Sequence, residues 1–74
     1  MDEFKNYLIN ECVNLYIRLN YRYSYENNEQ GTFERLKDII KYEQLLEIVR
    51  NNPVWDAKEM GREISEIIRE RTSL

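Results

Sequence analysis

The 74-residue sequence contains no histidine, one cysteine, one proline and two glycines. A single cysteine cannot form a disulfide within the chain, and a zinc site needs three or four cysteine or histidine ligands. Without histidine, Ser-His and Cys-His catalysis lack their base. The sequence also has no glycine-rich phosphate loop and no Asp-rich calcium loop. We therefore predict no catalytic residues, no metal and no cofactor, and we expect the protein not to be an enzyme.

Long apolar runs are also missing, because the longest aliphatic runs are pairs such as Leu45-Leu46 and Ile67-Ile68. Such short runs exclude a membrane-spanning helix. The first residues do not show the basic-then-apolar pattern of an export signal, and a free cysteine fits a reducing compartment, so we expect a cytoplasmic protein. Fourteen acidic and eleven basic residues give a net charge of −3, which argues against nucleic acid as a partner.

Glycine and proline interrupt the chain only at Gly31, Pro53 and Gly61, so tight turns and short strands have little support. Between these positions, apolar residues recur at intervals of three and four residues, which is the spacing of an amphipathic helix. We predict one all-α domain over residues 1–74, built as a small three-helix bundle. The predicted helices span about residues 2–24, 32–51 and 53–71.

We expect Asp2, Thr32 and Asn52 to cap these helices, because short polar side chains accept hydrogen bonds from the first free amides. Pro53 suits the first helical position after Asn52, where no amide donor is needed. Oppositely charged residues three or four positions apart are expected to form exposed ion pairs within the second and third helices. These pairs are Asp38–Lys41, Glu47–Arg50, Glu59–Arg62, Arg62–Glu66 and Glu66–Arg69.

The first helix carries two apolar stripes, although a helix in a small two-layer domain needs only one. One stripe comprises Phe4, Leu8, Cys12, Leu15, Leu19 and Tyr23. The second comprises Ile9, Val13, Ile17 and Tyr21. Two stripes indicate that the helix is central in the bundle, or that the second stripe contacts another chain. Because so short a chain buries a small core, we predict that dimerisation completes the bundle.

Residues 16–26 contain four of the six tyrosines, together with Arg18 and Arg22, which are neighbours on a helix. Alternating apolar residues from Ile17 to Tyr25 also fit a strand, so residues 19–25 are either the end of the helix or a strand. Three roles are open for the tyrosines. Tyr16 and Tyr23 could complete the core, the segment could anchor a protein partner, or it could stack on bases.

Trp55 follows the proline and faces away from the apolar side of the third helix. It either fills the junction between the second and third helices or projects outward as a binding anchor. The predicted partner-binding residues combine the second stripe, the Tyr/Arg segment and this tryptophan. They are Ile9, Val13, Ile17, Arg18, Tyr21, Arg22, Tyr25 and Trp55.

The surplus stripe and the absence of catalytic groups predict a non-enzymatic protein–protein interaction module. It would be a regulator or inhibitor that covers a partner's surface, and a phage-type anti-defence or anti-repressor protein is one concrete form. The richness in Asn, Ile, Tyr and Glu is typical of AT-rich bacterial or phage genomes. Two alternatives are a nucleic-acid-binding protein that uses the Tyr/Arg surface and a structural subunit of a phage-like assembly. The expected partners are a second copy, another protein, or both.

Overall fold

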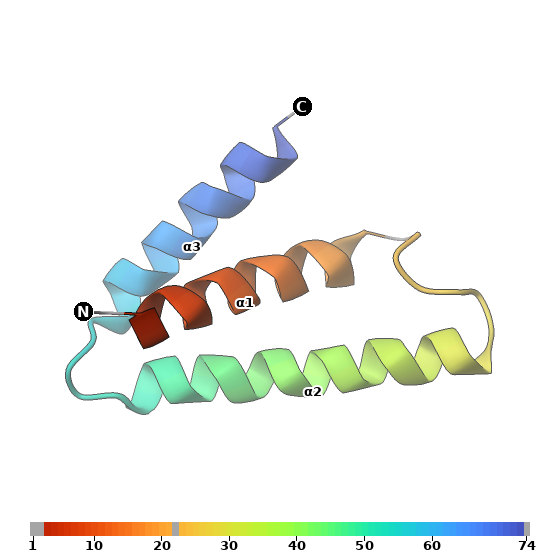
Figure 1. Cartoon of the computed structure of the whole chain (residues 1–74), viewed down its shortest axis with the longest axis horizontal. Coiled ribbons are helices and arrows are strands. Elements are labelled where there is room, and N and C mark those ends of the chain that lie inside the picture. The colour runs from red at the N-terminus through yellow and green to blue at the C-terminus, as the bar shows by residue number, and fades with distance from the viewer. Residues whose placement is uncertain (1–2, 22, 74) are drawn as a thin grey trace.

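A computed structural model describes residues 3–21 and 23–73 and consists of three α-helices (Figure 1). They are α1 (Glu3–Asn20), α2 (Glu29–Asn51) and α3 (Ala57–Thr72). The all-α prediction and the number of helices are confirmed, and no strand occurs in the described ranges. None of the three helices, within those ranges, is long and apolar enough to cross a membrane.

Helix α1 lies in the middle of the molecule and packs against both other helices (Figure 1). Helices α2 and α3 approach each other mainly near the loop that joins them, and α3 then diverges from α2. The three helices form a bundle that opens toward the end of α3, with extents of 41 × 29 × 19 Å. Of the two interpretations of a helix with two apolar stripes, the central position is the one that the structure shows.

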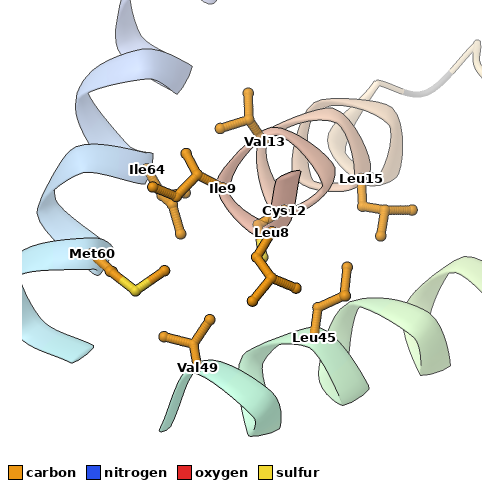
Figure 2. Packing of buried hydrophobic residues seen from close by; sticks show 9 residues of the cluster. All are labelled: Leu8, Ile9, Cys12, Val13, Leu15, Leu45, Val49, Met60 and Ile64. Atoms are coloured by element: carbon orange, nitrogen blue, oxygen red, sulfur yellow. The ribbon is translucent and has the colours of Figure 1, made fainter. Parts of the chain in front are cut away.

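The core draws on both stripes of α1 (Figure 2). Its nine buried residues are Leu8, Ile9, Cys12, Val13, Leu15, Leu45, Val49, Met60 and Ile64. Leu8 and Leu15 point toward α2, whereas Ile9 lies beside Ile64 of α3. Burial, and then the nearby carboxylate of Glu11, raise the pKa of the Cys12 thiol, so this cysteine stays protonated in the core.

Helix α1 ends at Asn20, four residues before the predicted end, and the predicted cap Asp2 lies outside the described residues. The chain turns after Asn20 and brings Tyr25 back to α2, where the Tyr25 hydroxyl donates a hydrogen bond to Asp38. Both open interpretations of residues 19–25 are therefore wrong beyond Asn20, since Tyr21 has no regular structure and residues 23–25 form a turn and bends.

Helix α2 begins three residues earlier than predicted. The cap is Asn28, whose side-chain oxygen accepts a hydrogen bond from the Gly31 amide at 2.8 Å. Thr32 lies inside the helix, and its hydroxyl donates to the Asn28 carbonyl at 3.1 Å, so the prediction that Thr32 is the cap is wrong. Gly31 itself is buried in the first turn because the backbone of Glu26 crosses directly over it.

Helix α3 begins at Ala57, four residues later than predicted. Asp56 is its cap and accepts hydrogen bonds from the amides of Lys58 and Glu59, at 3.0 and 3.4 Å. The prediction that Asn52 caps this helix is wrong, because its side chain accepts from the Val54 amide at 2.9 Å. That hydrogen bond forms a turn around Pro53 instead of starting a helix.

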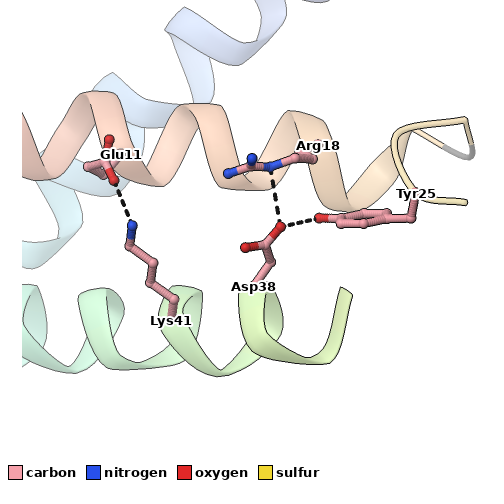
Figure 3. A network of polar contacts seen from close by, with 5 residues as sticks. All are labelled: Glu11, Arg18, Tyr25, Asp38 and Lys41. Carbon is pink, nitrogen blue, oxygen red and sulfur yellow. Dashed lines mark hydrogen bonds and ion pairs between the residues drawn. The ribbon is translucent and has the colours of Figure 1, made fainter. Parts of the chain in front are cut away.

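Ion pairs join α1 to α2 more than they reinforce single helices (Figure 3). The predicted Glu47–Arg50 pair is confirmed at 3.2 Å. The predicted Asp38–Lys41 pair is not formed, since both residues reach across to α1. Asp38 pairs with Arg18 at 3.3 Å and Lys41 pairs with Glu11 at 3.1 Å. The pairs predicted within the third helix are absent from the ion pairs of residues 3–21 and 23–73.

Candidate protein-interaction surface

The stripe predicted to meet a partner is partly used inside the molecule. Ile9 and Val13 are 5% and 0% exposed, so the expectation that they lie open on the surface is wrong. Helix α3 covers this side of α1, and Ile9 lies beside Met60 and Ile64 in Figure 2. Ile17 is half-buried against the core, and only Tyr21, at 62% exposed, projects outward.

The Tyr/Arg segment also makes internal contacts. Asp38 on α2 accepts a hydrogen bond from the Tyr25 hydroxyl at 2.6 Å, and the same oxygen lies 3.3 Å from Nε of Arg18 (Figure 3). These three residues tie the end of α1 and the following loop to α2. Tyr23 is 81% exposed, so it does not complete the core. Arg22 lies outside the described residues.

Burial, with the hydrogen bond to Asp38, raises the pKa of Tyr25 to about 12. An unfolded tyrosine titrates near 10, so the fold favours the neutral phenol. This contribution to stability is fully present below about pH 10 and is lost as the pH rises toward 12. We expect Tyr25→Phe to lower the free energy of unfolding by about 1 kcal/mol at pH 8. The difference in free energy of unfolding between Tyr25→Phe and the wild type should disappear as the pH rises from about 10 toward 12.

Urea denaturation followed by circular dichroism, at several pH values, measures this difference. Tyr21→Phe serves as the control, because the exposed Tyr21 side chain contributes little to the packing. A difference between wild type and Tyr25→Phe that stays constant from pH 8 to pH 12 would contradict the assigned role of the Tyr25 hydroxyl.

Trp55, in the loop between α2 and α3, does not project outward, which was the second of its two predicted positions. It is half-buried against the core, and its ring centroid lies 5.9 Å from that of Phe4. Phe4 in turn stacks on Tyr7 at 6.5 Å. Because Trp55 is held in this aromatic group, the neighbouring Val54, at 84% exposed, is the more open apolar side chain of the loop.

A groove of about 440 Å³ opens where α3 diverges from α2. All three helices contribute to it, and most of its lining is apolar. The lining residues are Tyr16, Tyr42, Leu46, Gly61, Ile64, Ser65, Ile68 and Arg69. The rings of Tyr16 and Tyr42 lie 6.3 Å apart, and Tyr16 remains 39% exposed. We call this groove, to which all three helices contribute residues, the α1–α2–α3 groove.

Gly61 lies on the α3 wall of this groove and is exposed. A methyl group added to it would meet nothing within 4 Å. Glycine inside a helix costs about 1 kcal/mol relative to alanine. The packing of the described residues does not compensate for this cost, in contrast to Gly31, which the Glu26 backbone covers.

A second apolar surface lies on the outer side of α2. Phe33, Leu36 and Ile40 are 57%, 52% and 57% exposed, and their spacing places them on one helix face. Lys37 lies over the Phe33 ring, 5.7 Å from its centroid. We call these three residues the α2 outer stripe. Helical phase places this stripe opposite the buried Leu45 and Val49 side of α2, so α1 cannot cover it.

The residues predicted from the sequence do not mark out the α1–α2–α3 groove or the α2 outer stripe. The predicted binding residues do not include Tyr42, Leu46, Gly61 or Ile68 of the groove, or any residue of the α2 outer stripe. One signal was present in the sequence, since Ala57 and Gly61 are small residues four positions apart on an apolar helix face. Within the described ranges, acidic and cysteine side chains do not gather into a group that could hold a metal ion.

Comparisons of the chain with protein-family models, with curated proteins and with solved structures find no match. Functional inference therefore rests on the residues and surfaces described above.

Proposed function

We propose that the protein is a non-enzymatic helical interaction module, a regulator or inhibitor that acts by covering the surface of a protein partner. The observation that carries this proposal is the excess of exposed surface. The chain exposes 6009 Å². A compact monomer of 9.1 kDa exposes about 4,900 Å². The radius of gyration, 13.4 Å, likewise exceeds the value of about 11 Å for a compact domain of this length.

The physical reason for the excess is the divergence of α3, which approaches α2 mainly near the loop that joins them and leaves the bundle open beyond it. Stable domains bury the apolar sides of their elements between two packed layers. Here α1 has neighbours on two sides, but the groove beside Tyr16 and the outer stripe at Leu36 have no covering layer among the described residues. A partner that lies on either surface would supply the missing layer.

The nucleic-acid alternative has less support. Arg18 and Tyr25, two of the residues expected to contact phosphates and bases, are engaged with Asp38. The net charge of −3 gives no general attraction to a polyanion. A phage-type anti-defence or anti-repressor protein remains one form of the proposed function.

Site-specific photo-crosslinking in cell lysate tests the proposal. A photoreactive phenylalanine analogue would replace Phe33 on the α2 outer stripe or Tyr16 in the groove. As a control, it would replace the exposed Glu66 on the polar side of α3. We expect covalent adducts, with a second copy or with another protein, at position 33 or 16 and none at position 66. Equal labelling at all three positions, or no adduct at any, would count against an interaction module.

A further inference from the structure

We propose that the α2 outer stripe, with the acidic residues that follow it, binds an amphipathic helix of a different protein, and that this helix carries lysine or arginine beside its apolar residues. The inference rests on the proposed function, because it states the chemistry of the partner that covers one of the two apolar surfaces. Three features of α2 support it: the spacing of its outer residues, a carboxylate without a basic partner, and the like charges that a second copy would bring together.

The outer side of α2 has the spacing of a helix–helix contact. Phe33, Leu36 and Ile40 are all more than half exposed, and they are separated by steps of three and four residues. The same alternation continues to the exposed Glu43 and Glu47, and we call these five residues the α2 outer row. Alternating steps of three and four keep residues on one side of a helix, where a second helix packs along them. Since the described ranges contain no strand whose edge a peptide could extend, a helix is the structure that fits this row.

The α2 outer row is apolar at its first three positions and acidic at its last two. Ile40 borders a shallow hollow of about 300 Å³. The other residues that line this hollow are Glu43, Gln44 and Glu47. Lys37 lies at the opposite end of the row, over the Phe33 ring. A helix that packs along the row therefore places some of its side chains on apolar groups and the adjoining ones beside carboxylates.

Glu43 has no ion-pair partner within the described part of the chain. Lys41 reaches across to α1 and pairs with Glu11 at 3.1 Å, and Arg50 pairs with Glu47 at 3.2 Å. None of the residues three or four positions from Glu43, which are its neighbours on the helix, is basic. A lysine or arginine on a helix that packs along the row would supply the opposite charge.

Like charges disfavour a second copy of the chain on the same row. Two copies with parallel α2 helices would place Glu43 of one beside Glu43 of the other. In the antiparallel arrangement, Leu36 of one copy packs on Ile40 of the other. The exposed Glu47 then lies opposite Glu29, another exposed acid at the start of α2. Because like charges across an interface exclude a partner, the row fits a different protein better than it fits itself.

Selection from a displayed library of helical peptides tests the chemistry of the partner. The probes are alanine-rich helices randomised along one row with steps of three and four residues. The library is selected on the whole wild-type chain and depleted on Leu36→Gln, which keeps a helix-forming residue at this exposed position. We expect enriched peptides to carry apolar residues at successive randomised positions, and lysine or arginine at the adjoining ones. Enriched peptides without basic residues, or no peptide that prefers the wild type to Leu36→Gln, would overturn the inference.

The affinity of an enriched peptide for charge variants tests the role of Glu43. Fluorescence anisotropy of the labelled peptide should show a dissociation constant about tenfold higher for Glu43→Lys at low salt, because an attraction becomes a repulsion. This effect should shrink at high salt. Glu66→Lys makes the same change in net charge at an exposed position on α3, and should stay within about twofold of the wild type. Equal effects of the two variants would overturn the assignment, since net charge alone would then determine binding.

Photo-crosslinking separates failure of this inference from failure of the proposed function. Adducts with another protein at position 16 alone, or with a second copy at position 33, would overturn helix binding by the α2 outer row and leave the proposed function standing. If the selection yields no peptide and neither position forms an adduct, both are overturned.

Discussion

Alanine in place of Gly31 should lower the free energy of unfolding by about 1–3 kcal/mol, the usual cost of an extra group in a filled site. A methyl group at Gly31 would collide with the carbonyl oxygen of Glu26, which is backbone and cannot rotate away. The loop between α1 and α2 must then shift. Its movement would strain the hydrogen bond from Tyr25 to Asp38 and the cap at Asn28.

Alanine in place of Gly61 should instead raise the free energy of unfolding. Nothing lies within 4 Å of the added methyl group, and alanine favours the helix by about 1 kcal/mol. Urea denaturation of the wild type and both variants, at one low chain concentration, measures the two changes in stability. In a domain of this size, each kcal/mol moves Tm by about 4–8 °C. A stabilising Gly31→Ala would show that the loop does not close over Gly31, and a destabilising Gly61→Ala would show that Gly61 is not open.

Aspartate in place of Val13 should unfold the protein. Val13 is fully buried, and its α1 neighbours in the core, Ile9 and Cys12, offer a carboxylate no ion-pair partner. An unpaired buried charge costs about 3–5 kcal/mol. That is comparable to the total stability of about 4–11 kcal/mol expected for a chain of this length. Circular dichroism should show loss of most of the helical signal, or a large fall in the urea midpoint.

Ile40→Asp is the matched control for Val13→Asp, since it makes an apolar-to-acid change on a helix at a position that is 57% exposed. We expect its stability to lie within about 0.5 kcal/mol of the wild type at low chain concentration. Comparison of Val13→Asp with Ile40→Asp distinguishes an apolar residue of the core from one on the surface. If Val13→Asp were tolerated as well as Ile40→Asp, α1 would not be the central helix of the fold.

The existence and order of the helices could be predicted because apolar spacing is a local property. Their ends could not, because each depends on a contact made across the structure. Thr32 and Asn28 are both good caps, and Asn28 is used because the loop folds back over Gly31. Similarly, Pro53 predicts the start of a helix, but the Asn52 side chain forms a turn there, and Trp55 packs on the core before Asp56 starts α3.

The exposed apolar surfaces were harder to predict than the fold. Two apolar stripes on α1 fit a central helix and an interface helix equally well, and spacing alone does not distinguish them. Ile9 and Val13 were assigned to a partner, but α3 supplies their neighbours from the far end of the sequence. The groove beside Tyr16 exists because α3 diverges from α2, and this angle between helices is not encoded in the pattern of any one helix.

The central place of α1 has a consequence for how the protein is made. Helix α1 is synthesised before α2, and α3 emerges from the ribosome last of the three. A nascent chain that has reached Asn51 can pair α1 with α2, yet it still exposes Ile9 to solvent or to a chaperone. The core is therefore complete only when the segment with Met60 and Ile64 has been synthesised. A chain terminated before this segment would expose apolar residues and would be prone to aggregation and degradation.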